Sequence, residues 1–268
     1  MKRHLIYLCV FALTVILLSA NKKPVTLFLV GDSTMADKTE LDISPERGWG
    51  QLFPTYLKRD GSIIVENHAK NGRSTKSFID QGRWDNVVKR IKRGDIVIIQ
   101  FGHNDAKQSD PQRYTSIEDY RSNLMQMVKD VKKKGGKPIL ATSCCRRYFK
   151  PDGTFRSGHH GAYPTAVRQV AEFMNVPLID AEELTKNWLT NAGKDESKKF
   201  YMHVAAGESQ KFPNGKIDNT HFREAGALAV GRLIAKEIKD KDIKPLSQYI
   251  DFEDTTPLYT TRVQGIDD

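Results

Sequence analysis

Cysteine is scarce in this chain, with only three among 268 residues. Cys9 lies in an apolar segment near the start, so Cys144 and Cys145 are the only two in the rest of the chain. Neighbouring cysteines rarely bridge each other, and two thiols provide neither a disulfide framework nor a zinc site. The composition therefore excludes disulfide-stapled and zinc-ribbon scaffolds, and we expect both thiols to be inert and semi-buried.

Long hydrophobic runs are also missing, apart from residues 5–18. This run follows Lys2, Arg3 and His4 and ends at Ser19 and Ala20, the pattern of a secretory signal peptide over residues 1–20. An uncleaved anchor is the alternative, but the run is short of the ~20 residues that span a bilayer. We therefore expect export, to the periplasm or outside the cell, without stable membrane insertion after cleavage.

An excess of acidic residues is absent too, since 42 Lys and Arg stand against 33 Asp and Glu, a net charge of +9. Removal of residues 1–20 takes away Lys2 and Arg3, and 40 − 33 leaves +7. This balance favours an acidic partner. The sequence shows no aromatic-basic ladder and no zinc-finger spacing, so it favours an anionic polysaccharide and not a nucleic acid.

What the chain does contain is an alternation of two patterns. Short apolar runs predict strands, and stripes of apolar residues three and four apart predict helices between them. The runs are residues 25–30, 63–65, 96–101, 138–141 and 176–179. Continuously apolar strands separated by helices indicate a parallel sheet covered on both faces. We predict one doubly wound α/β domain over residues 24–243, followed by a polar tail, residues 244–268, packed loosely on the surface.

Most of the residues that could take part in catalysis follow the predicted strands. Ser33 follows the first, Gly72 the second and Asn104 the third, while Asp218 and His221 precede the last helix on a tight turn. Ligand sites of such folds lie at the carboxyl ends of the strands. A serine needs a histidine as base, and the histidine needs a carboxylate to orient it. The backbone N–H groups of Ser33 and Gly72, with the Asn104 amide, could stabilise an oxyanion.

These blocks resemble the SGNH, or GDSL, hydrolase superfamily: Gly31-Asp32-Ser33, Gly72, Gly102-His103-Asn104-Asp105 and Asp218-Asn219-Thr220-His221. The resemblance implies a three-layer α/β/α fold with a flavodoxin-like five-stranded parallel sheet of order 2-1-3-4-5. It implies Ser33 as nucleophile, His221 as base, Asp218 as its orienter, and Ser33, Gly72 and Asn104 as oxyanion hole. It implies no metal and no organic cofactor. Within the superfamily, the blocks are most similar to those of rhamnogalacturonan acetylesterases.

The resemblance predicts an exported serine esterase that removes acetyl groups from an acetylated acidic polysaccharide of plant cell walls. One alternative is another SGNH esterase that acts on xylan, sialate or lipid acyl esters. A second alternative is a carbohydrate-binding protein whose hydrolase site is vestigial.

Four further residues are candidates for contact with the substrate. Arg73, Arg146 and Arg147 each follow a strand, and arginine pairs in a bidentate way with carboxylates, so we expect at least one to contact a uronate. The alternative is solvated surface charge. Trp49, between Gly48 and Gly50, could stack against a sugar or belong to the core.

Overall fold

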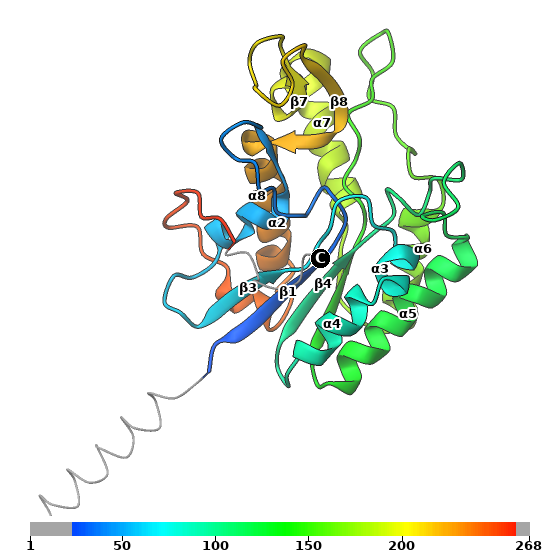
Figure 1. The fold of residues 1–268 in the computed structure, drawn as a ribbon. Coiled ribbons are helices and arrows are strands. Elements are labelled where there is room, and N and C mark those ends of the chain that lie inside the picture. The colour runs from blue at the N-terminus through cyan, green and yellow to red at the C-terminus, as the bar shows by residue number, and fades with distance from the viewer. Residues whose placement is uncertain (1–22, 261–268) are drawn as a thin grey trace, which may run out of the picture.

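The central element is a five-stranded parallel sheet (Figure 1). The computed structural model describes residues 23–260, so the signal peptide predicted for residues 1–20 lies outside the described residues. The strands are β1 (Val25–Gly31), β3 (Ile63–Asn67), β4 (Ile96–Gln100), β5 (Lys137–Ala141) and β6 (Leu178–Ile179). Their spatial order is β3-β1-β4-β5-β6, which is the predicted order 2-1-3-4-5 once the parallel strands alone are numbered.

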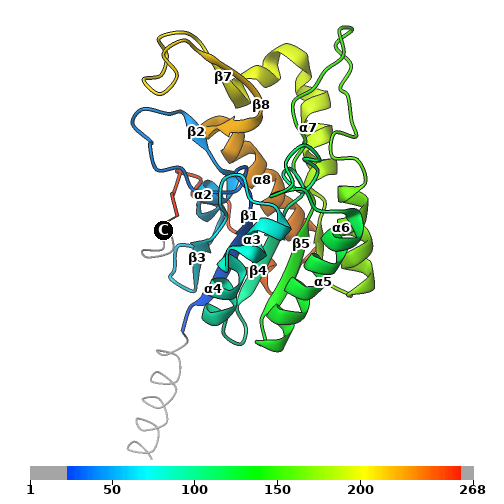
Figure 2. The same ribbon diagram turned by 45° about the vertical axis from the view of Figure 1, so that its right-hand side comes forward.

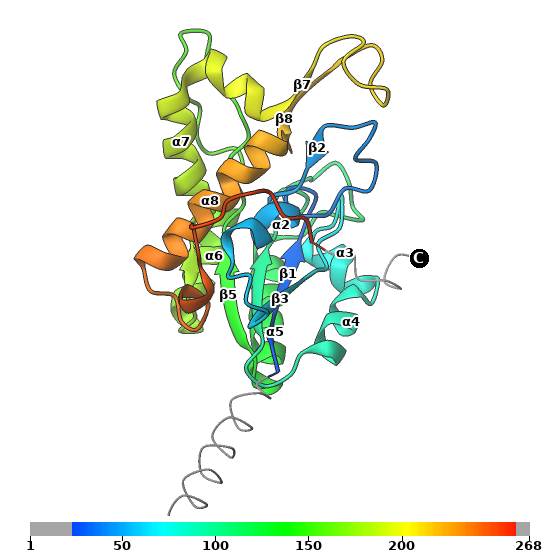
Figure 3. The same ribbon diagram turned by 90° about the vertical axis from the view of Figure 1, so that its left-hand side faces the viewer.

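Helices cover both faces of this sheet, as the side view in Figure 3 shows. Successive side chains of a strand point to opposite faces, and β1 accordingly sends Leu27 and Leu29 into one core and Phe28 and Val30 into the other. The first core is closed by α2 (Trp49–Leu52), α7 (Ala181–Glu196) and α8 (Glu224–Asp240). The second is closed by α3 (Thr75–Asp80), α4 (Arg83–Arg90), α5 (Ile117–Lys133) and α6 (Tyr163–Phe173). The predicted three-layer α/β/α architecture is confirmed.

A second, smaller sheet stands beyond the carboxyl ends of the parallel strands (Figure 2). It consists of β2 (Glu46–Arg47), β8 (Lys216–Arg223) and β7 (Tyr201–Val204), in that order and antiparallel. No pattern in the sequence predicted this sheet or α7. β2 and β7 are short, with two and four residues, and the eight residues of β8 are mostly polar and half-buried, so no continuous apolar run marks these strands.

The C-terminal segment is packed more firmly than predicted. Leu246 and Ile250 are buried at 0% and 3% exposure, and Ile250 forms a β-bridge with Leu57. Leu246 belongs to a short 3-10 helix, η3 (Leu246–Tyr249). The prediction of a loosely packed tail is therefore wrong for this part, because a few apolar side chains dock against α8 and η1 (Phe53–Tyr56). None of the helices among residues 23–260 has the length and apolar character needed to cross a membrane.

Candidate active site

The loop after β1 is fixed by the aspartate that precedes Ser33. Asp32 is fully buried and accepts hydrogen bonds from the Thr34 N–H (3.0 Å), the Thr34 hydroxyl (2.9 Å) and His103 Nδ1 (3.0 Å). Burial alone would raise the pKa of Asp32, but the charge and hydrogen bond of His103, helped by Thr34, lower it to about 2. Gly31 is required before it, because a Cβ there would lie 2.7 Å from the Gln100 carbonyl oxygen. The strand therefore ends in a rigid turn that presents Ser33.

The structure joins Ser33, His221 and Asp218 in one hydrogen-bonded relay. His221 Nδ1 donates to Asp218 Oδ2 at 2.7 Å, which leaves Nε2 to accept the Ser33 hydroxyl at 2.8 Å. Asp218 Oδ1 in turn accepts the backbone N–H groups of Thr220 and His221. Burial opposes ionisation, but the hydrogen bond and charge of His221 hold the pKa of Asp218 well below its ordinary range. Such a relay can move a proton from a hydroxyl to an imidazole and stabilise the imidazolium.

Asp218 and His221 lie within strand β8, and not on a turn at the start of the last helix as predicted. Asp218 pairs with Met202 while Phe222 pairs with Tyr201, so the register shifts and residues 219–221 bulge out of the ladder. The bulge turns the two side chains toward each other, and α8 begins only at Glu224. Bulges commonly re-aim a side chain beside an active site.

The three predicted oxyanion donors line one cavity together with His221. Gly72 has a positive φ of 75°, a conformation that favours glycine. No hydrogen bond among the described residues uses the backbone N–H of Ser33 or Gly72 as donor. The Asn104 amide donates one hydrogen to the Arg73 carbonyl at 3.0 Å, which leaves its second hydrogen available. The cavity is therefore lined by three residues that each have a donor not used elsewhere in the described chain.

The four candidates for substrate contact have different environments. Arg146 lines the cavity, whereas Arg73 lies beside it and donates to the Asn71 carbonyl. Arg147 is buried and holds Ser197, Asn219 and the Lys194 carbonyl, so it fixes the β8 bulge and does not face the cavity.

Trp49 is fully buried, and its indole N–H donates to Gln100 Oε1 at 3.0 Å. Stacking of a sugar on Trp49 is therefore excluded, since neither face of its ring is accessible. The side chain packs beneath the Ser33 loop as a core residue.

Sequence analysis missed four charged residues around the site. Lys107, Arg113 and Glu46 line the cavity. Lys38 is buried behind it, and its ammonium donates to the Ser33 carbonyl (2.7 Å) and to Asn71 Oδ1 (2.6 Å) and pairs with Glu46 (3.0 Å). The only available signal was proximity in sequence: Lys38 follows Ser33 by five residues, and Lys107 follows Asn104 by three.

Metal binding and thiol chemistry would depend on the His, Cys, Asp and Glu side chains of the described chain. Residues 23–260 contain no group of three or more His, Cys, Asp or Glu side chains that could hold a metal ion. Cys144 and Cys145 are both buried, and burial raises the pKa of each thiol, that of Cys145 to about 12. Neither thiol is therefore a reactive thiolate at neutral pH.

A parallel α/β sheet with a hydroxyl–imidazole–carboxylate relay at its carboxyl edge defines a serine-hydrolase type of site. The chain belongs to the GDSL-like Lipase/Acylhydrolase family, whose pattern it matches over residues 29–228. It is accordingly a carboxylic ester hydrolase.

Within this family, the chain is similar to two proteins named as rhamnogalacturonan acetylesterases. The chain is 36% identical over 230 residues to rhamnogalacturonan acetylesterase RhgT of Bacillus subtilis, covering 85% of this chain and 95% of that protein. It is 32% identical to the probable rhamnogalacturonan acetylesterase YesY of the same organism, covering 84% and 96%.

Solved structures share the fold. The crystal structure of YxiM from Bacillus subtilis matches with a TM-score of 0.71 at 28% identity, covering 82% of this chain and 58% of that one. A catalytic mutant of Axe2, an acetylxylan esterase from Geobacillus stearothermophilus, matches with a TM-score of 0.55 at 18% identity, covering 81% and 96%. At that identity, the second match bears on the fold alone.

Proposed function

We propose that this ester hydrolase is an exported carbohydrate acetylesterase that removes acetyl groups from rhamnogalacturonan, a pectic polysaccharide that contains uronic acid. The names of its two relatives with 36% and 32% identity support this substrate. The basic residues at the cavity, Lys107, Arg113 and Arg146, support an acidic substrate. The signal-peptide pattern of residues 1–20 supports export.

In the proposed mechanism, Ser33 Oγ attacks the acetyl carbonyl carbon while its proton moves to His221 Nε2. Asp218 keeps the imidazole in the tautomer that can accept this proton. The N–H groups of Ser33 and Gly72 and the Asn104 amide stabilise the oxyanion. His221 then returns the proton to the sugar oxygen as the C–O bond breaks. Water attacks the acetyl-enzyme by the same route, and acetate leaves.

The hydrogen-bonded relay of Ser33, His221 and Asp218 is the observation on which the proposal mainly depends. A carbohydrate-binding protein with a vestigial site would have no need to keep both hydrogen bonds. Esterases of this family that act on xylan, sialate or lipid esters would use the same relay. The identity of the substrate therefore has to be measured.

Replacement of Ser33 by alanine tests the mechanism. We expect Ser33→Ala to lower kcat for acetate release by about 10⁴- to 10⁶-fold. Binding of the acetylated oligosaccharide, measured by calorimetry, should survive. Ser122→Ala on the exposed side of α5 is the matched control and should behave as wild type.

A panel of acetylated rhamnogalacturonan, xylan and sialoglycan tests the substrate, with released acetate as the readout. The proposal requires the highest kcat/KM on rhamnogalacturonan. Undiminished acetate release by Ser33→Ala would contradict the mechanism, and a preference for xylan or sialoglycan would contradict the substrate.

A further inference from the structure

The catalytic cavity carries positive charge that the described part of the chain compensates only in part. Lys107 and Arg146 line it, and neither forms an ion pair with a carboxylate among residues 23–260. The one hydrogen bond of the Arg146 guanidinium goes to the His103 carbonyl at 3.4 Å, and its buried Nε has no partner among the described residues. Arg113, which also lines the cavity, pairs with Asp110 at 2.9 Å. These three cations face space that a substrate would enter.

Two further arginines, Arg73 and Arg83, extend the positively charged region away from Ser33. Arg73 Nε and Arg83 Nε both donate to the same neutral acceptor, Gln81 Oε1, at 2.9 and 3.3 Å. No carboxylate of the described chain forms an ion pair with either guanidinium. The Arg113 guanidinium lies near Arg73 as well, since a Cβ at the neighbouring Gly72 would be 3.5 Å from Arg113 Nη1. Burial and then the charges of Arg83 and Arg113 lower the pKa of Arg73. We call Arg146, Lys107, Arg113, Arg73 and Arg83 the basic track.

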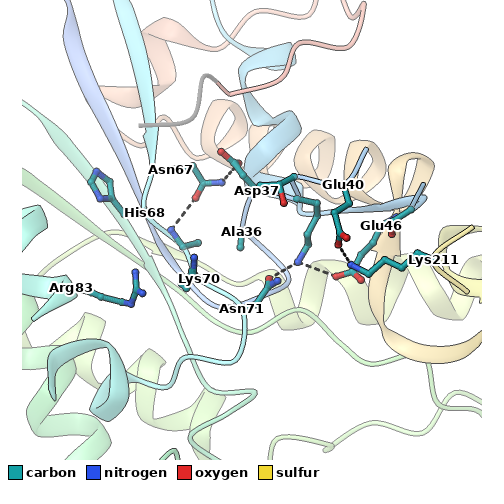
Figure 4. Close-up of a pocket in the computed structure, with 14 residues that line it drawn as sticks. Ala36, Asp37, Glu40, Glu46, Asn67, His68, Lys70, Asn71, Arg83 and Lys211 are labelled. Atoms are coloured by element: carbon teal, nitrogen blue, oxygen red, sulfur yellow. Dashed lines mark hydrogen bonds and ion pairs between the residues drawn. The ribbon is translucent and has the colours of Figure 1, made fainter. Parts of the chain in front are cut away.

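The basic track connects two cavities. The second cavity is lined by Arg83, Lys211 and other polar residues, and it shares Asn71 and Glu46 with the catalytic cavity. In Figure 4, Arg83 lies on one side of Asn71, and Glu46 and Lys211 lie on the other. Glu46 in the shared wall pairs with Lys38 at 3.0 Å and lies 4.0 Å from Lys216, and Glu40 pairs with Lys211. The lining of the second cavity has four cationic residues and three carboxylates (Asp37, Glu40 and Glu46), a net charge of +1, and the lining of the catalytic cavity has three cationic residues and Glu46, a net charge of +2.

Clustered guanidinium groups repel one another, and a carboxylate placed between them relieves that repulsion while forming charge-assisted hydrogen bonds. We infer that the basic track binds carboxylates on at least two uronic acid residues of one polysaccharide chain, which runs from the catalytic cavity into the second cavity. This inference rests on the proposed function and deepens it, because it assigns selectivity for a polyanionic chain to particular residues.

The test compares one acetylated rhamnogalacturonan with its carboxyl-reduced form, which keeps the acetyl groups but has lost the negative charges. Wild type should prefer the acidic form, by at least tenfold in kcat/KM at low salt, and 1 M NaCl should diminish the preference. Arg73→Gln/Arg83→Gln should lower this preference about five- to tenfold. The loss should appear with a long acidic oligosaccharide and be absent with a fragment that contains a single uronate.

Lys236→Gln/Lys241→Gln is the matched control, since it removes the same charge from the exposed far end of α8 and should keep the wild-type preference. The rate on a small aryl acetate and the Tm report whether each variant is folded. A folded Arg73→Gln/Arg83→Gln variant that keeps the wild-type preference for the acidic polysaccharide would overturn the inference that the basic track binds uronates.

Two outcomes separate the track from the proposed function. If wild type deacetylates both forms equally well, the track is wrong and the proposed function stands. If wild type cleaves the aryl acetate but neither polysaccharide, the proposed substrate is wrong, and so is the inferred role of the basic track.

Discussion

Lys38 brings a buried ammonium group into contact with three segments around Ser33. It holds the Ser33 carbonyl, the side chain of Asn71 next to Gly72, and Glu46 of β2. Burial lowers the pKa of Lys38, and the carboxylate of Glu46 opposes that shift. Since the proposed nucleophile and a proposed oxyanion donor lie on two of these segments, we expect Lys38 to position them relative to each other.

Replacement of Lys38 by methionine should therefore lower kcat more than it changes KM. Displacement of a reacting group by about 1 Å can cost 10²-fold, so we expect a loss of about 10- to 100-fold on an aryl acetate. Lys38→Arg, which keeps the charge and the donors, should recover part of it.

Loss of Lys38 would also leave the half-buried Glu46 with Lys216, at 4.0 Å, in place of its closer ion-pair partner, and weaker compensation of a partly buried charge destabilises a fold on its own. The double variant Lys38→Met/Glu46→Gln removes that charge, and Glu46→Gln alone is its matched control. A folded double variant with the kcat of the control would contradict the positioning role.

Asp105 connects the loop after β4 to the first turn of α3. Its Oδ1 accepts the Thr75 N–H at 2.9 Å and the Thr75 hydroxyl at 2.6 Å, while its buried Oδ2 has no partner in the described chain. The Asp105 carbonyl accepts the Tyr163 hydroxyl at 3.0 Å. Burial raises the pKa of the Asp105 carboxyl to about 7. The hydrogen bonds that connect the loop after β4 to α3 are therefore accepted by a carboxyl group that is neutral in mildly acidic solution.

The pH dependence of stability follows from this raised pKa. Between an unfolded pKa near 3.8 and a folded pKa of about 7, the folded state holds one more proton than the unfolded state. The contribution of Asp105 to stability is therefore full below pH 3.8 and is lost as the pH rises to about 7.

Asp105→Asn keeps the Oδ1 acceptor and removes the titration. Its free energy of unfolding relative to wild type should rise from pH 4 to pH 7 and stay constant above, as measured by urea titration at each pH. A difference that is the same at all pH values would contradict the raised pKa.

The C-terminal segment of the described chain packs against elements from its first third. Ile250 bridges to Leu57, and the Asp251 N–H donates to the Tyr56 carbonyl. The segment that follows residue 243 is therefore part of the domain at least as far as Ile250.

Ile250→Ala should lower the free energy of unfolding by about 2–5 kcal/mol, the usual cost of removing a large buried aliphatic side chain. Glu253→Ala, at an exposed position three residues later, should change it by less than about 0.5 kcal/mol. Urea or thermal unfolding measures both variants. Equal stability of the two variants would show that the segment packs loosely, as the sequence analysis had predicted.

The amino-acid sequence was sufficient to predict the parallel sheet, the order of its strands through the family resemblance, and the residues that meet at its carboxyl edge. These depend on local signals: buried parallel strands are continuously apolar, and the motif residues directly follow them. Ser33 was found in this way, whereas Asp218 and His221 follow no strand of the parallel sheet and were found from their spacing before the last helix and from the family resemblance. The structure joins the three side chains by hydrogen bonds of 2.7 and 2.8 Å.

Four features depend on the three-dimensional fold and could not be predicted: the small sheet, the bulge that aims His221 at Ser33, the burial of Trp49 and the cations that face the cavity. Each depends on contacts between segments far apart in the chain, such as β7 with β8 or Lys38 with Asn71. Short polar strands have no periodicity that distinguishes them from loops, and the sequence cannot show which way an arginine after a strand points. For that reason Arg147 supports the bulge while Arg146, its neighbour, lines the cavity.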